Sequence, residues 1–131
     1  MKSKLKPTHK LDYIKLYLDP WREDVRGWTL TQRGAQLELL LSAIRGGGEI
    51  VVENHDQIYL DIGAISAKDK ADVDWVLSHW DQASVKSRTG KPAIRFTHPL
   101  ATETVQDWIE FLSGSGRGGA TTQERRRSAS N

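Results

Sequence analysis

The chain has 131 residues, the size of one domain with a single hydrophobic core. Charged residues make up 27% of it and hydrophobic residues 37%, an ordinary balance for a globular protein. It contains no cysteine, which excludes disulfides and thiolate metal sites and fits a reducing compartment. No apolar stretch follows the basic N-terminus, and no apolar run is long enough to cross a membrane. We therefore expect a cytoplasmic protein without a membrane partner.

The net charge of +2 is unevenly distributed. Residues 1–10 carry four lysines and no acid, and residues 113–131 carry four arginines against one glutamate, whereas residues 11–112 carry 11 basic and 16 acidic side chains. We predict a basic N-terminal arm (1–10), a folded domain (11–112) and a disordered Gly/Ser/Arg-rich tail (113–131). Basic ends on an acidic body favour a polyanionic partner, although they also fit a role in solubility alone.

The first half of the domain predicts an extended segment, a helix and a strand. Residues 11–21 are rich in Tyr, Ile and Leu and predict a strand or extended arm that ends at Pro20. Thr29 and Gln32 have the spacing of a capping box at a helix start. Three glycines at 46–48 end this helix, and Glu49–Val52 follows as a short strand. The inward face of the helix is predicted from the apolar spacing of Leu37, Leu40, Leu41 and Ile44.

The second half predicts two more helices, a hairpin and a final helix. Asn54 with Gln57, and Ser66 with Asp69, have the spacing of helix caps. The second of these helices turns four residues inward: Val73, Val76, Leu77 and Trp80. The hairpin has its arms at Val85–Arg88 and Ala93–His98, with Thr89-Gly90-Lys91-Pro92 as the turn. The final helix covers Thr102–Leu112.

This order of elements predicts an α+β fold. The expected form is a winged helix-turn-helix of three helices and a β-hairpin wing, with an extra C-terminal helix and basic disordered tails. The residues expected to share its core are Leu40, Leu41, Ile62, Val76, Leu77, Trp80, Ile94 and Phe96.

A family resemblance lies between Asp12 and Ile50. The residues that carry it are Tyr17-Leu18-Asp19, Trp21, Thr29-Leu30-Thr31-Gln32-Arg33-Gly34-Ala35, Leu37, Leu40, Leu41 and Gly48-Glu49-Ile50. They resemble the YdaU-type prophage domain family of unknown function, which is the N-terminal winged-helix domain of phage replisome-organiser proteins. The resemblance covers roughly residues 12–100. It implies a winged helix and a role at DNA during phage replication or its control.

Two groups of residues are candidate DNA contacts. On the third helix the exposed strip is Trp75, Ser78, His79 and Gln82, whose polar groups can pair with base edges. Four aspartates at 69, 72, 74 and 81 repel phosphates, so packing or protein contact is the alternative for this strip. On the hairpin the cations are Lys86, Arg88, Lys91 and Arg95. They either contact the phosphate backbone of DNA or are solvated charges that protect an exposed strand edge from pairing with other strands. In the tail, Arg125, Arg126 and Arg127 are candidate phosphate contacts.

The sequence offers no pattern typical of catalysis. The four histidines are scattered, and the glycines at 46–48 lack the following Lys-Ser/Thr of a phosphate loop. We expect neither an enzyme nor a cofactor or metal site. The first hypothesis is a DNA-binding accessory protein of phage or prophage type, acting in replication initiation or its control. The alternative is a protein-interaction module that binds a phage or host replication protein through the Trp75 face.

Overall fold

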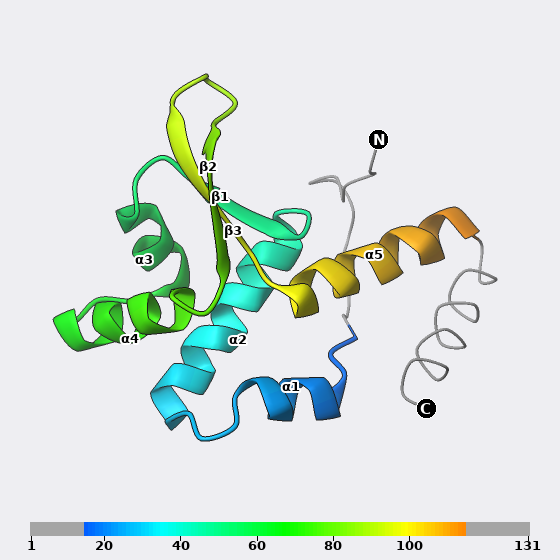
Figure 1. Ribbon diagram of the computed structural model, residues 1–131, viewed down its shortest axis with the longest axis horizontal. Helices are drawn as coiled ribbons and strands as arrows, with labels where there is room; N and C mark the ends of the chain where they lie inside the picture. The colour runs from blue at the N-terminus through cyan, green and yellow to red at the C-terminus, as the bar shows by residue number, and fades with distance from the viewer. Residues whose placement is uncertain (1–14, 115–131) are drawn as a thin grey trace.

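The computed structural model describes residues 15–114. The predicted basic arm, most of the predicted tail and Arg125–Arg127 lie outside the described residues. Within them the chain is α+β, and its elements in order are α1 (Leu18–Asp24), α2 (Leu30–Arg45), β1 (Glu49–Val52), α3 (Asp56–Ile62), α4 (Ala67–Leu77), β2 (Asp81–Lys86), β3 (Pro92–Thr97) and α5 (Pro99–Gly114). In Figure 1, α2 runs through the middle, with α3 and α4 to its left and α5 to its right.

Side-chain caps fix the starts of α2 and α4. The capping box at the start of α2 is confirmed, because Thr29 Oγ1 accepts the N–H of Gln32 and Gln32 Oε1 accepts the N–H of Thr29. Ser66 caps α4 by accepting the N–H of Asp69. The predicted cap at Asn54 is one residue early, since His55 is the N-cap of α3, although the Asn54 side chain does accept the N–H of Asp56.

The three strands form an antiparallel sheet in the order β1-β3-β2. The last strand in sequence is therefore the central one, and Phe96 lies between Ile50 of β1 and Gln82 of β2. The predicted hairpin is present, but its first strand begins at Asp81, four residues before the expected Val85. The Phe96 side chain is buried against the helices and joins the sheet to the core.

The core is formed mainly by α2, α4 and the sheet. Burial of five predicted core residues is confirmed: Leu40, Val76, Leu77, Trp80 and Phe96. They pack with Leu39, Ala43, Ile44, Ile50, Ile58, Val73 and Val105. Fully burying one such aliphatic side chain stabilises the fold by about 1.5–3 kcal/mol.

Two predicted core positions are wrong, and a third is only half-buried. Leu41 is 36% exposed, and Leu37, which was also predicted to face inward, is 37% exposed, because α2 turns Leu39, Leu40 and Ala43 inward. Ile94 is 40% exposed, because it lies nearer the hairpin tip than Phe96, between Val52 and the small Ser84. Ile62 is half-buried against the core.

The segment before α2 also differs from the expected extended arm. Leu18–Asp24 is the helix α1, and Pro20 lies in its first turn. A proline is tolerated there because the first amides of a helix have no partner within it. Trp21 packs against the core from this helix, and Val25, just after it, is fully buried. Pro20 thus lies within a helix and does not end an extended arm.

Candidate nucleic-acid interface

The hairpin tip is a defined turn tied to the end of β1. Ser87 N–H donates to Lys91 O at 2.8 Å, and Gly90 takes the positive φ of +83° that the turn requires. Thr89 Oγ1 donates to Glu53 Oε2 at 3.1 Å. The hydroxyls of Ser87 and Thr89, together with the Lys91 charge, lower the pKa of Glu53. The tip is therefore held by side-chain contacts, and its cations project from an ordered turn.

The structure brings three of the four hairpin cations together. Lys86 ends β2, whereas Arg88 and Lys91 lie in the turn, and all three are exposed. Arg95 is exposed as well, but it pairs with Ala83, three rungs below the Lys86–Pro92 pair and on the opposite face of the sheet. None of the four forms an ion pair with another residue of the described chain. The hairpin therefore presents a cluster at its tip and one separate cation.

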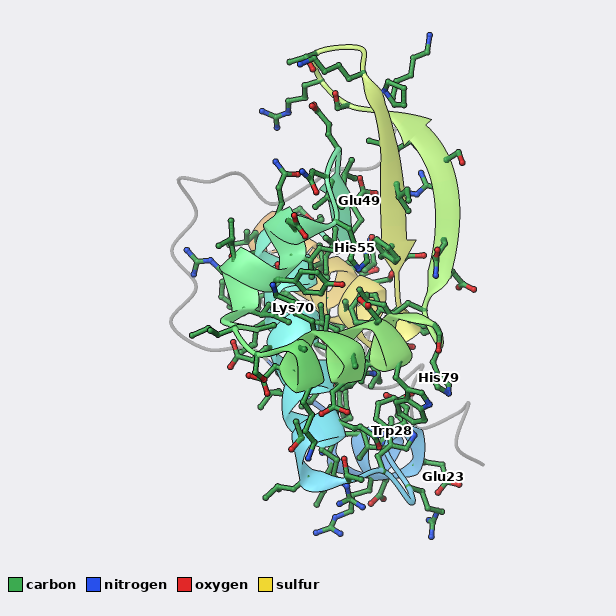
Figure 2. All side chains as sticks on the ribbon, turned by 90° about the vertical axis from the view of Figure 1, so that its left-hand side faces the viewer. Glu23, Trp28, Glu49, His55, Lys70 and His79 are labelled. Carbon is green, nitrogen blue, oxygen red and sulfur yellow. The ribbon has the colours of Figure 1, made fainter. Side chains whose placement is uncertain are left out.

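An aromatic patch lies at the C-terminal end of α4. It is formed by Trp75 of α4, by His79 just after this helix, and by Trp28, which precedes α2. The ring centroids of Trp28 and Trp75 are 5.0 Å apart in an edge-to-face arrangement, and those of Trp75 and His79 are 4.4 Å apart. Trp75 remains 39% exposed. Figure 2 shows Trp28 and His79 at the end of the molecule opposite the hairpin tip, so the two candidate surfaces are separate.

The polar groups of this strip are largely engaged by the helix itself. Ser78 Oγ donates to Trp75 O, and His79 Nδ1 lies 2.9 Å from the same carbonyl. An Nδ1 that donates to a carbonyl leaves Nε2 as the free acceptor of the ring. Gln82 does not extend the strip as predicted, because α4 ends at Leu77 and Gln82 lies in β2. Of the three polar side chains, His79 retains one free ring nitrogen at the end of α4.

Asp74 belongs to a cluster that sequence patterns did not indicate. His55 Nε2 lies 2.8 Å from Asp74 Oδ1, and Tyr59 donates its hydroxyl to the same oxygen. Desolvation together with this carboxylate raises the pKa of Tyr59 to about 12. His55 precedes α3 and Asp74 lies on α4, so the cluster ties the two helices together.

A second polar cluster is buried beneath α1. Gln36 is fully buried, and it donates from Nε2 to Asp24 Oδ2 while Oε1 accepts Trp80 Nε1–H at 2.7 Å. His98 Nδ1 accepts the N–H of Leu100, which places its proton on Nε2, 3.1 Å from Asp24 Oδ1. Burial disfavours the Asp24 charge, but hydrogen bonds from His98 and Gln36 outweigh it and lower the pKa of Asp24. Sequence periodicity gave no indication of this cluster.

No family model, curated protein or solved structure matches the chain. Within residues 15–114, no three His, Cys, Asp or Glu side chains are grouped to hold a metal ion. No helix in that part of the chain has the length and apolar character needed to cross a membrane.

Proposed function

We propose that this chain is a winged-helix DNA-binding protein that contacts the phosphate backbone through its hairpin tip. The succession α2, β1, α3, α4, β2, β3 supports this, because a helix-turn-helix followed by a hairpin is the order of a winged helix. The antiparallel pairing of β1 with β3 supports it too, since it joins the hairpin to the helical part. In this proposal α4 is the second helix of the helix-turn-helix and β2–β3 is the wing.

The observation that carries the proposal is the exposed cation cluster at the tip. Lys86, Arg88 and Lys91 have no carboxylate partner among the described residues, so phosphates do not have to displace one. Contacts to phosphates supply affinity and orientation without reading sequence. Glu53 lies close to Lys91 and offsets part of this charge.

The helix α4 favours weak rather than strong base reading. Ser78 and His79 Nδ1 are engaged with the backbone, and α4 carries three aspartates at 69, 72 and 74. Carboxylates near the phosphate backbone oppose deep insertion of this helix into a groove. We therefore propose sequence-tolerant binding. The family resemblance extends the proposal to an accessory role of phage or prophage type, in replication initiation or its control.

A mobility-shift titration over a salt series tests the proposal with the double variant Arg88→Ala/Lys91→Ala. Affinity should fall for every duplex about equally, and the negative slope of log K against log salt should become less steep by about 2. The matched control removes two exposed cations of α1 and α4, Arg22→Ala/Lys68→Ala, and should leave the slope unchanged. Equal slopes for the hairpin variant and the parent would refute DNA binding through the hairpin.

The aromatic patch supports a second candidate function, the binding of a phage or host replication protein. Trp75 is 39% exposed and stacks edge-to-face on the half-buried Trp28, and aromatic side chains that become buried on binding dominate many protein interfaces. In this case Trp75→Ala abolishes co-purification of the partner, whereas the hairpin double variant retains it. The opposite result, with the partner lost only in the hairpin variant, excludes the patch as the interface.

A further inference from the structure

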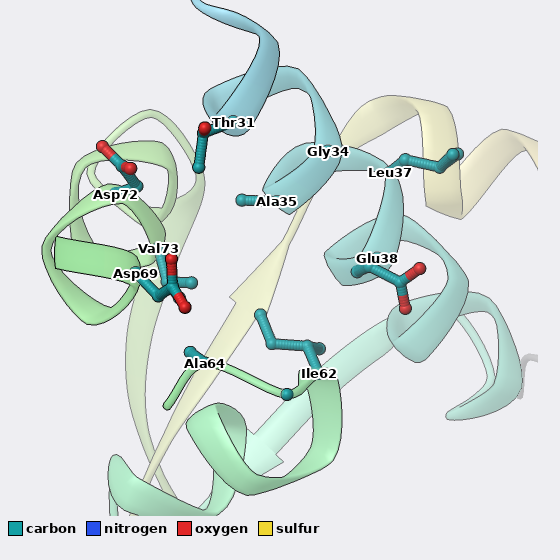
Figure 3. A pocket seen from close by; sticks show the side chains of 11 residues that line it. Thr31, Gly34, Ala35, Leu37, Glu38, Ile62, Ala64, Asp69, Asp72 and Val73 are labelled. Atoms are coloured by element: carbon teal, nitrogen blue, oxygen red, sulfur yellow. The ribbon is translucent and has the colours of Figure 1, made fainter. Parts of the chain in front are cut away.

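A groove lies between α2 and α4, on a part of the surface that neither proposal above uses. It has a volume of about 330 Å³, at the lower end of the range for ligand pockets. Figure 3 shows apolar side chains in its interior, with the acidic side chains of Glu38, Asp69 and Asp72 around them. The interior residues are Ala35, Ile62, Ala64 and Val73. The space accommodates one or two side chains of a partner.

Gly34 keeps one wall of the groove open. It lies within α2, where glycine is unfavourable because it loses more conformational freedom than other residues. A Cβ at this position would meet no atom within 4 Å, so packing does not require glycine there. Its backbone also has no positive φ that would favour glycine. Neither packing nor backbone conformation therefore requires glycine at position 34, and the lack of a side chain there leaves the groove open.

The charge of the groove is entirely negative. The residues that line it include three carboxylates and no lysine or arginine. Asp72 Oδ2 is inaccessible to solvent and has no hydrogen-bond partner among the described residues. A partner's cation does not reach this oxygen, but the rest of the half-buried Asp72 side chain adds to the negative charge of Glu38 and Asp69 at the groove. The groove thus selects against acidic partners and against nucleic acid.

Several exposed apolar residues are adjacent in sequence to residues that line the groove. Leu30 precedes Thr31 and is 87% exposed, and Ile65 follows Ala64 and is 85% exposed. Leu37 lines the groove itself, and Leu41 lies one turn further along α2. Leu37 and Leu41, four residues apart on one face of α2, therefore continue the apolar surface of the groove, and apolar surface rimmed by charge is typical of a protein-binding site.

We propose that this groove binds a basic amphipathic helix of a partner protein. An apolar side chain of that helix fills the space beside Gly34, and flanking lysines or arginines pair with Glu38, Asp69 and Asp72. This is the helix-in-groove mode of peptide recognition, with charge complementarity setting the choice of partner. It is independent of DNA binding at the hairpin tip, which lies at another part of the molecule (Figure 1).

The test uses the full chain and two synthetic amphipathic helices of leucine with lysine and of leucine with glutamate, each labelled with fluorescein. Fluorescence anisotropy should show binding of the lysine peptide alone. Gly34→Leu should weaken that binding by at least about tenfold because the new side chain fills the groove. Gly34→Ala is the matched control and should retain binding, because a methyl group leaves most of the space open. Circular dichroism and thermal unfolding confirm that each variant is folded.

A second variant keeps the proposal testable if Gly34→Leu does not fold. Glu38 is exposed, so Glu38→Lys leaves the core intact and should weaken the lysine peptide by at least about tenfold through repulsion. Equal binding of both peptides would overturn the charge assignment. Parent-like binding of the lysine peptide by a folded Gly34→Leu or by Glu38→Lys would overturn the groove. Loss of binding in Trp75→Ala alone would assign the peptide to the aromatic patch and also overturn it.

Discussion

Replacing Gln36 by leucine should destabilise the protein by about 2–4 kcal/mol. The buried Gln36 side chain satisfies Trp80 Nε1–H and donates to Asp24, so leucine keeps the apolar volume and removes both hydrogen bonds. A buried donor left without an acceptor costs about 1–3 kcal/mol. The lost donor to Asp24 adds about 1 kcal/mol, a discounted figure because the Asp24 side chain is 25% exposed and water replaces part of the bond.

Urea unfolding followed by tryptophan fluorescence and by circular dichroism measures this change. For a small domain with a slope of about 1–2 kcal/mol per molar urea, the midpoint should fall by at least about 1 M. The control is Gln106→Leu, the same change at an exposed position of α5, which should stay within about 0.5 kcal/mol of the parent. A Gln36→Leu midpoint equal to that of Gln106→Leu would refute the inference that the cluster depends on Gln36.

Three further predictions concern stability. The pKa of Asp24 is lower in the folded state than in the unfolded state, so the ionised carboxylate stabilises the fold above the unfolded pKa, and this stabilisation is lost as pH falls through the folded pKa. Between neutral and strongly acidic pH, the urea midpoint should therefore fall less for Asp24→Asn than for the parent. Parallel curves for the two proteins would contradict this. Gly34→Ala should stabilise the protein by about 0.5–1 kcal/mol in thermal unfolding, because alanine is the better helix residue and its Cβ meets no atom. Gly46→Ala should destabilise the protein, because its Cβ would lie 2.6 Å from Glu49 O. Equal melting temperatures for the two variants would be inconsistent with both expectations. Thr29→Ala removes the capping box and should cost about 1 kcal/mol, measured as a loss of urea stability, while an unchanged midpoint would show that the cap is dispensable.

The features predicted correctly from sequence depend on residues close together in the chain. The Thr29–Gln32 and Ser66–Asp69 pairs lie within one helical turn, and their hydrogen bonds form as expected. The inward residues of α4 follow helical spacing and are buried. Such patterns are readable because the contacts that they describe form within a single element.

The errors and omissions arise from contacts between elements. Which of the α2 leucines turn inward is decided by the packing of α4 and α5, so Leu41 was misplaced. The Asp24–Gln36–His98 cluster joins α1, α2 and the end of β3, and no spacing rule links residues so distant in sequence. The groove could not be predicted from the sequence for the same reason, because its walls come from α2, α4 and the α3–α4 turn, which are distant in the chain.

The central place of β3 in the sheet determines the order in which this protein can fold. Strand β1 leaves the ribosome before α3, α4 and β2, yet its partner β3 follows all of them in the chain. The helices and the hairpin are local and form quickly, whereas pairing β1 with β3 closes a long loop and is entropically slower. We expect the docking of the finished hairpin onto β1 to be the late, rate-limiting step, and until then β1 is an unpaired edge open to other strands.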